Sequence, residues 1–299
     1  MSEKLNKQRD KVASKSLFKL LSQKVPQKLP KQLFKQLTKQ WTLCCYALSF
    51  FSRCPVPRTI NFKAYPFHLG NAYFPFVGAL YAVICFVVYY LSLSVFEHTI
   101  SVILMLLAGL LFTGAFHEDG LADCCDGFGG GYNKTQCLAI MKDSQIGTYG
   151  VLGLIILFAL KVTALIQLSE LNQFSEFGLL HFFGVLFSAA VVSRFSALWL
   201  IQYSEYARED ETSKSTQSSH QLPQSYLVGA LLFSLLSLLW MPVMSILAIV
   251  IVTTTSTLLC KAYFNKKIEG YTGDCLGFLQ QLNELLILLT CLALFSANL

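Results

Sequence analysis

A short acidic segment carries most of the side chains in this 299-residue chain that could do chemistry. Residues 117–126, HEDGLADCCD, contain one histidine and four carboxylates. On an α-helix Asp119, Asp123 and Asp126 stand at i, i+4 and i+7, so they project from one face. Like charges on one face repel each other unless a cation neutralises them. The spacing predicts a divalent cation site, and hard oxygen ligands favour Mg²⁺, with Mn²⁺ or Ca²⁺ next.

Two other interpretations of this segment stay open. His117 with Cys124 and Cys125 could bind zinc, although adjacent cysteines point to different faces of a helix. A solvated acidic helix end, stabilised by the helix dipole, needs no ligand at all.

Further polar motifs could join the acidic segment in binding an anion. Glycines at 127 and 129–131 allow close backbone approach, and Lys142, beside Asp143, offers a positive charge for phosphate. A second polar motif, EGYTGDCLG at residues 269–277, contains Thr272 and Asp274 and precedes Glu284. A third, residues 51–58, offers the guanidiniums of Arg53 and Arg58, of which Arg58 is better explained as a membrane anchor.

The composition is that of a membrane protein. Apolar residues make up 54% of the chain and charged residues only 13%, against roughly 45–50% and 25% in soluble domains. This composition argues against a soluble globule or a disordered chain. It also argues against a nucleic-acid-binding protein, because 14 of the 23 Lys and Arg residues precede residue 64, so the positive charge belongs to the N-terminal segment. The ten cysteines show no disulfide or zinc spacing.

Long apolar runs predict an all-α bundle of about seven transmembrane helices with cytoplasmic active-site loops. The run from residue 225 to 260 has 36 uncharged residues with Met241-Pro242 near its middle, which predicts a helical hairpin. The other predicted spans are residues 72–96, 99–116, 150–168, 177–203 and 285–299, the last beginning about a turn earlier.

The distribution of basic residues predicts the orientation. Segments 1–71, 117–149, 204–224 and 261–284 hold 21 of the 23 Lys and Arg residues, so they are expected to be cytoplasmic. The polar stretch at residues 205–224 is interpreted as a flexible loop.

The N-terminal segment is expected to differ from the rest. Residues 1–40 form a basic extension without a signal-peptide core, and residues 41–299 form the polytopic catalytic domain. Lysines alternate with Leu and Phe around Pro26 and Pro30, so the extension is either an interfacial helix on anionic lipid or a partly disordered tail.

Two basic residues lie inside predicted spans. Lys161 and Arg194 are costly to expose to lipid, so each is expected to face the bundle interior with a carboxylate, a carbonyl or substrate as partner. Substrate binding and a purely structural intramembrane pair are equally compatible with this position.

The ordered motifs resemble the cobalamin synthase family, the adenosylcobinamide-GDP ribazoletransferases. HEDGLADCCDGFGGG is followed by MKDSQIGTYG, then by GYTGDCLGF and a downstream Glu, while FSRCPVP and YFPFVGAL are similar to the N-terminal pattern of that family. The resemblance runs from about Phe50 to Glu284 and leaves out the basic extension.

The resemblance implies a multi-pass, Mg²⁺-dependent enzyme of the bacterial inner membrane, with its N-terminus and active-site loops in the cytoplasm. It would transfer the adenosylcobinamide phosphate moiety from adenosylcobinamide-GDP to α-ribazole or its 5′-phosphate, releasing GMP. The expected partners are the two substrates and the membrane lipid, and no nucleic acid is expected to bind. Whether the protein forms a homo-oligomer is left open.

Roles for individual residues follow from the resemblance and the chemistry together. Asp119, Asp123 and Asp126 are expected to hold Mg²⁺, or alternatively Mn²⁺, on the diphosphate and to serve catalysis, with Asp143 or Asp274 completing the ligand shell. The general base is His117 or an aspartate near the metal. The substrate-binding candidates are Arg53, Lys142, Lys161, Arg194 and Thr272.

Two rival functions fit the sequence less well. The Asp123-x-x-Asp126-Gly127 spacing is similar to that of CDP-alcohol phosphotransferases, but Phe128 and glycines follow where that family continues with Ala-Arg and two further aspartates. A transporter is disfavoured because the carboxylates lie at the expected cytoplasmic ends and the mid-span charges are basic.

Overall fold

The structure is a computed structural model that describes residues 31–171, 178–208 and 219–297. The chain divides into two compact units, Met1–Thr42 and Leu43–Leu299. The boundary falls within helix α2 (Lys31–Phe51), and every site discussed below lies in the second unit. Most of the predicted basic extension, and residues 209–218 of the predicted loop, lie outside the described residues.

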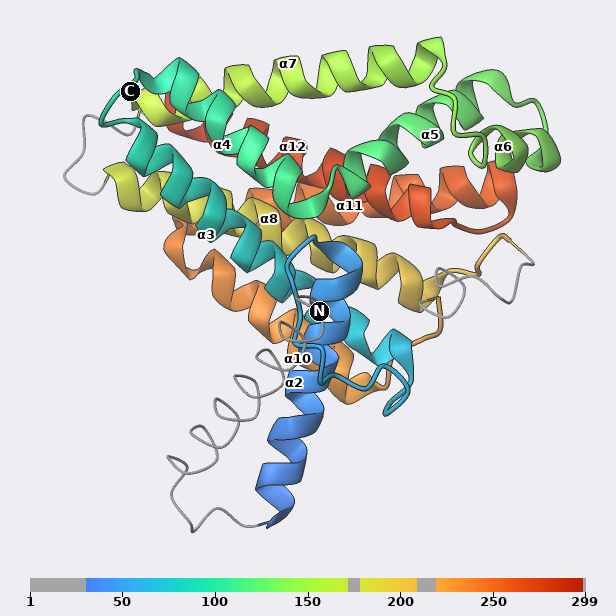
Figure 1. The fold of residues 1–299 in the computed structure, drawn as a ribbon. Helices are drawn as coiled ribbons and strands as arrows, with labels where there is room; N and C mark the ends of the chain where they lie inside the picture. The colour runs from blue at the N-terminus through green and yellow to red at the C-terminus, as the bar shows by residue number, and fades with distance from the viewer. Residues whose placement is uncertain (1–30, 172–177, 209–218, 298–299) are drawn as a thin grey trace, which may run out of the picture. The chain divides into compact units, whose positions relative to one another are not determined.

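Helices form nearly all of the second unit (Figure 1). Within the described ranges the only β-type pairing is a single bridge between Tyr206 and Tyr271. After α2 the elements are η1 (Phe67–Tyr73), α3 (Phe74–Ser92), α4 (His98–Thr113), α5 (Phe116–Gly130), α6 (Lys134–Ile140), α7 (Thr148–Leu171), α8 (Gly178–Tyr203), α10 (Gln224–Ser237), η3 (Leu238–Trp240), α11 (Val243–Ile268) and α12 (Gly273–Ser296).

The helices confirm the predicted membrane architecture. Among the described residues, five are long and apolar enough to span a membrane, or six if the bent pair α4 and α5 counts as one span. Residues 224–240 form a further, shorter apolar helix, so the prediction of about seven is roughly met. The predicted hairpin is present as α10 and η3 followed by α11, which begins directly after Pro242.

The last span begins earlier than predicted. α11 ends at Ile268 and α12 starts at Gly273, so Asp274 and Glu284 both lie on the last helix that is long and apolar enough to span a membrane, Asp274 in its first turn. The prediction began this last span near Glu284, whereas both carboxylates are accommodated on the helix by ion pairs with basic side chains.

A sharp bend separates α4 from α5. The two helix axes differ by 87°, and the bend is made by Gly114 and Ala115, whose φ angles are 70° and 57°. Glycine adopts this left-handed conformation readily as a helix C-cap, whereas alanine does so only under strain. The bend lets the acidic segment run as a separate helix beside α12.

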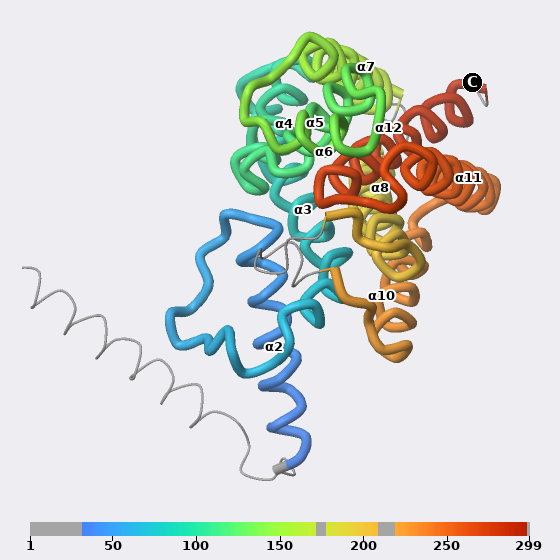
Figure 2. The backbone as a smooth tube through the Cα atoms, turned by 90° about the vertical axis from the view of Figure 1, so that its right-hand side faces the viewer, coloured from blue at the N-terminus to red at the C-terminus, as the bar shows by residue number. Residues whose placement is uncertain are grey.

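Helix α12 is the centre of the packing around the site. It packs against α5, α7, α8 and α11, and α3 packs against α4 and α8. Figures 1 and 2 both show α5 next to α12. Small residues permit this approach: a Cβ on Gly120 would lie 2.9 Å from the carbonyl oxygen of Asp274, and one on Gly277 would lie 2.9 Å from that of His117.

Candidate active site

The acidic segment is helical as predicted, and its packing adds a fourth aspartate. Asp123 is half-buried and is repelled by Asp274, Asp119 and Asp126, while Arg208 attracts it. We call Asp119, Asp123, Asp126 and Asp274 the carboxylate cluster. Three of its members come from α5 and one from the first turn of α12.

Asp126 holds the start of α7. One of its carboxylate oxygens accepts a hydrogen bond from the backbone N–H of Gly147 at 2.7 Å, and the other accepts one from Gly150 at 2.9 Å. A Cβ on Gly147 would lie 2.5 Å from Oδ1 of Asp126, so this glycine permits the contact. A carboxylate has about four acceptor positions, so these bonds leave capacity for a further ligand.

Asp274 is held by two neighbours. Nη2 of Arg208 donates to its Oδ2 at 2.7 Å, and the Thr272 hydroxyl donates to the same oxygen at 3.2 Å. Thr272 is fully buried and caps the N-terminus of α12 by accepting from the N–H of Cys275. The structure thus gives Thr272 a capping position, and its predicted contact with substrate stays a prediction.

Three further residues that were predicted to bind the metal or the substrate lie on the surface. Asp143 and Lys142 are exposed between α6 and α7, and Oδ1 of Asp143 accepts from the N–H of Gln145 at 3.1 Å. Arg53 is also exposed, and its backbone N–H donates to Phe112 at 2.7 Å. Its side chain lies against Gly114 at the bend between α4 and α5.

The cluster provides suitable donors for Mg²⁺ but not a preformed site. Its members offer only carboxylate oxygens, the ligands that Mg²⁺ prefers. Across the part of the chain that is described, no three His, Cys, Asp or Glu side chains are grouped closely enough to hold a metal. The roles of the four cluster aspartates and Asp143 as ligands therefore stay predictions.

His117 lies in a cavity of about 40 Å³ at the start of α5. Its ring is buried and stacks on Phe74 at 5.5 Å between centroids. Neither ring nitrogen has a hydrogen-bond partner in the described structure. A buried polar group without a partner is costly, so a ligand that satisfies it would be favoured. The cavity is otherwise mostly aromatic, with Phe50, Phe51, Phe116, Tyr206 and Tyr271 in its wall.

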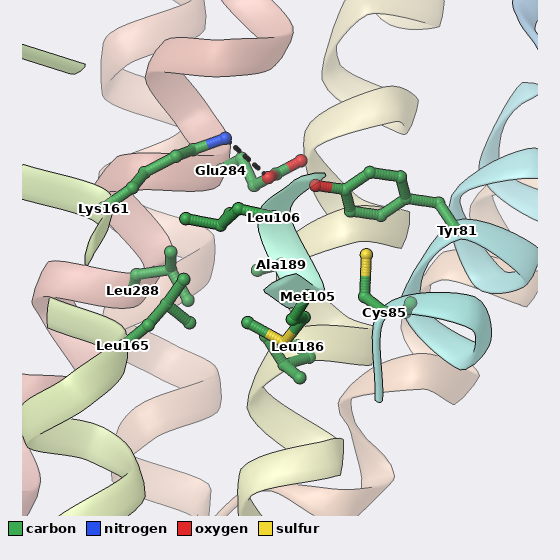
Figure 3. Close-up of a pocket in the computed structure, with 11 residues that line it drawn as sticks. Tyr81, Cys85, Met105, Leu106, Lys161, Leu165, Leu186, Ala189, Glu284 and Leu288 are labelled. Atoms are coloured by element: carbon green, nitrogen blue, oxygen red, sulfur yellow. Dashed lines mark hydrogen bonds and ion pairs between the residues drawn. The ribbon is translucent and has the colours of Figure 1, made fainter. Parts of the chain in front are cut away.

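Lys161 and Arg194 both face the bundle interior and share Glu284, as Figure 3 shows for the lysine. Nζ of Lys161 lies 2.7 Å from Oε1 of Glu284, and Nη1 of Arg194 lies 3.4 Å from Oε2. The expected carboxylate partner is therefore present. Since the side chains are almost fully buried, the ion pairs account for both basic residues without substrate, and their substrate-binding role stays a prediction.

Side-chain amides connect this buried ion pair to α5. Gln281 accepts from Nζ of Lys161 at 2.6 Å and donates to Oε1 of Glu118 at 2.9 Å. Gln280 donates to Oε2 of Glu284 at 2.6 Å. Neither glutamine was predicted from the sequence, although QQLNE at 280–284 is an unusually polar run inside a spanning helix.

Arg208 was also missed, because the stretch after α8 was interpreted as flexible. Its first residues are paired: the N–H of Ala207 donates to Tyr271 and the N–H of Tyr271 donates to Glu205, each at 2.9 Å. A Cβ on Gly270 would collide with the carbonyl of Glu205. This pairing brings Arg208 to Asp274.

Known proteins match nearly the whole second unit. A family model described as cobalamin-5-phosphate synthase matches residues 43–292. A relative from Pseudoalteromonas atlantica is 39% identical over 244 residues, covering 81% of this chain and 88% of its own. Relatives from Vibrio parahaemolyticus and Shewanella frigidimarina are 37% and 36% identical, covering 84% and 83% of this chain and 91% and 92% of their own. All three are named adenosylcobinamide-GDP ribazoletransferase. No solved structure matches.

Proposed function

Because this chain belongs to the cobalamin-5-phosphate synthase family, we propose that it is an adenosylcobinamide-GDP ribazoletransferase. The acceptor hydroxyl of α-ribazole, or of its 5′-phosphate, attacks the phosphorus attached to adenosylcobinamide. The bond from that phosphorus to the oxygen shared with GMP breaks, and GMP leaves as an anion. The observation that carries the proposal is the carboxylate cluster, formed where the acidic helix α5 meets the start of α12.

The cluster suits the charge of this reaction. When bound, Mg²⁺ would neutralise the diphosphate and the departing GMP. Asp119, Asp123 and Asp126 are its proposed ligands, with Asp274 or Asp143 completing the shell. Arg53 and Lys142 lie on exposed segments and are proposed to contact phosphate oxygens.

His117 is the proposed general base. Its two unpartnered ring nitrogens and its place in the cavity support this role, because a base needs a free nitrogen to take the acceptor hydroxyl proton. An aspartate of the carboxylate cluster is the alternative base.

The decisive experiment is a GMP-release assay with purified protein in detergent. We expect GMP from adenosylcobinamide-GDP and α-ribazole in the presence of Mg²⁺. We expect EDTA to lower the rate by more than about 100-fold, and added Mg²⁺ or Mn²⁺ to restore it, since metal activation supplies several kcal/mol to such transfers. Undiminished turnover in EDTA would contradict a role for the metal in the reaction. Consumption of a lipid alcohol would favour the rival CDP-alcohol phosphotransferase.

The protein is proposed to lie in the bacterial inner membrane with the carboxylate cluster in the cytoplasm, as the distribution of basic residues favours. A reporter that is active only in the periplasm should be silent when fused after Gly131 and active when fused after Met241, at the tip of the hairpin. The opposite pair of signals would invert the topology. Equal signals would contradict the hairpin.

A further inference from the structure

Arg208 contacts the carboxylate cluster without being one of the basic residues predicted to bind phosphate. Its guanidinium is within 2.7 Å of Asp274 and attracts Asp123. We propose that Arg208 binds the diphosphate of the nucleotide substrate, exchanging Asp274 for phosphate oxygens. This inference rests on the proposed function, since it takes the diphosphate of adenosylcobinamide-GDP as the ligand.

The charge balance of the cluster supports this role. A site built only to hold a cation gains nothing from an arginine among its ligands, because the arginine repels the cation. A site that binds a cation together with a diphosphate needs both charges, with carboxylates facing the metal and the guanidinium facing the phosphate oxygens. Four aspartates and one arginine match the second kind of site.

The guanidinium also has donors to spare. Arginine carries five N–H donors, and the bond to Asp274 uses Nη2. The Nε of Arg208 is buried and has no hydrogen-bond partner in the described ranges. Because the side chain is still 26% exposed, part of it is accessible to a ligand. A phosphate can accept two parallel hydrogen bonds from such a fork, which a lysine cannot supply.

The backbone holds this arginine in place. The reciprocal hydrogen bonds between Glu205, Ala207 and Tyr271 fix the residues just before it, and the rings of Tyr206 and Tyr271 meet edge to face at 5.5 Å. By contrast, Lys161 and Arg194 are buried and share Glu284. Of these three basic side chains, Arg208 is therefore the one that contacts the cluster.

The test compares Arg208→Gln and Arg208→Lys with the wild-type enzyme in nanodiscs. For Arg208→Gln we expect the Kd of adenosylcobinamide-GDP in EDTA, and its KM in Mg²⁺, to rise roughly 10–100-fold, the range for a lost charge-assisted hydrogen bond. The KM of α-ribazole should change less than about 3-fold. Lysine should restore only part of the affinity, since it keeps the charge and loses the fork.

Two control variants separate substrate binding from a structural role. Gly270→Ala disturbs the backbone pairing without changing charge, and Lys134→Ala removes a surface cation that pairs with Glu269. Gly270→Ala is expected to shift the KM of both substrates together, and if Arg208→Gln does the same, the inference is overturned. An unchanged Kd for adenosylcobinamide-GDP in Arg208→Gln, with an active wild type, overturns it while leaving the proposed function intact. A wild-type enzyme that releases no GMP overturns both.

Discussion

Replacing Asp123 by asparagine is expected to lower GMP release by more than about 100-fold while the protein still inserts into the membrane. Even an outer partner of a metal site typically contributes 10–100-fold, and Asp123 is repelled by the three other aspartates of the cluster. Asparagine keeps the shape of the side chain and removes one of the mutually repelling charges. Thermal stability should therefore stay the same or rise.

Asp123 gives a cleaner test than its neighbours. Asp126 anchors the start of α7, and Asp274 is bonded to Arg208 and Thr272, so substitutions there would also disturb the fold. Glu269→Gln is the matched control, because that carboxylate is exposed and pairs with the surface residue Lys134. The measurements are the GMP-release rate and the melting temperature of each variant. Wild-type activity in Asp123→Asn would place the chemistry elsewhere.

Replacing Glu284 by glutamine is expected to destabilise the protein by about 3–5 kcal/mol, the range for breaking a buried ion pair from one side. Glu284 neutralises both Lys161 and Arg194 inside the bundle, and all three side chains are almost fully buried. Glutamine keeps the volume but leaves two cations without their carboxylate. The measurement is thermal or denaturant unfolding in detergent, together with the amount of protein in the membrane.

Lys161→Met provides the comparison for Glu284→Gln. It removes one cation and leaves Glu284 bonded to Arg194 and Gln280, so it should be less destabilising. If both variants unfold like the wild type, the ion pair does not hold the helices together. If Lys161→Met is stable and yet loses GMP release, the predicted role of Lys161 in substrate binding is supported instead.

Local periodicity accounts for what the sequence predicted well. The i, i+4, i+7 spacing correctly put Asp119, Asp123 and Asp126 on one helix, and Met241-Pro242 marked the turn of the hairpin. Both features depend on neighbouring residues alone. Intramembrane partners for Lys161 and Arg194 were likewise expected from the cost of burying a charge in lipid.

Contacts between distant segments account for what was missed. Asp126 and Gly147 are 21 residues apart, and the bonds between residues 205–207 and Tyr271 leave no periodic signal. The start of α12 was placed too late because a charge was taken to end a span. Pairing by Arg208 and Lys161, which only the fold brings near, makes such charges acceptable.

Glu118 lies between His117 and Asp119, and Gln281 ties it to the buried polar side chains of α12. The position of α5, and with it the spacing of its aspartates, is thus set partly by polar contacts inside the helical bundle. A substitution at Gln281 would therefore be expected to disturb the aspartates of α5 through Glu118, although Gln281 is not itself among the proposed ligands. Substitutions at such buried positions are expected to lower the rate of the reaction even where every proposed ligand and the proposed base are unchanged.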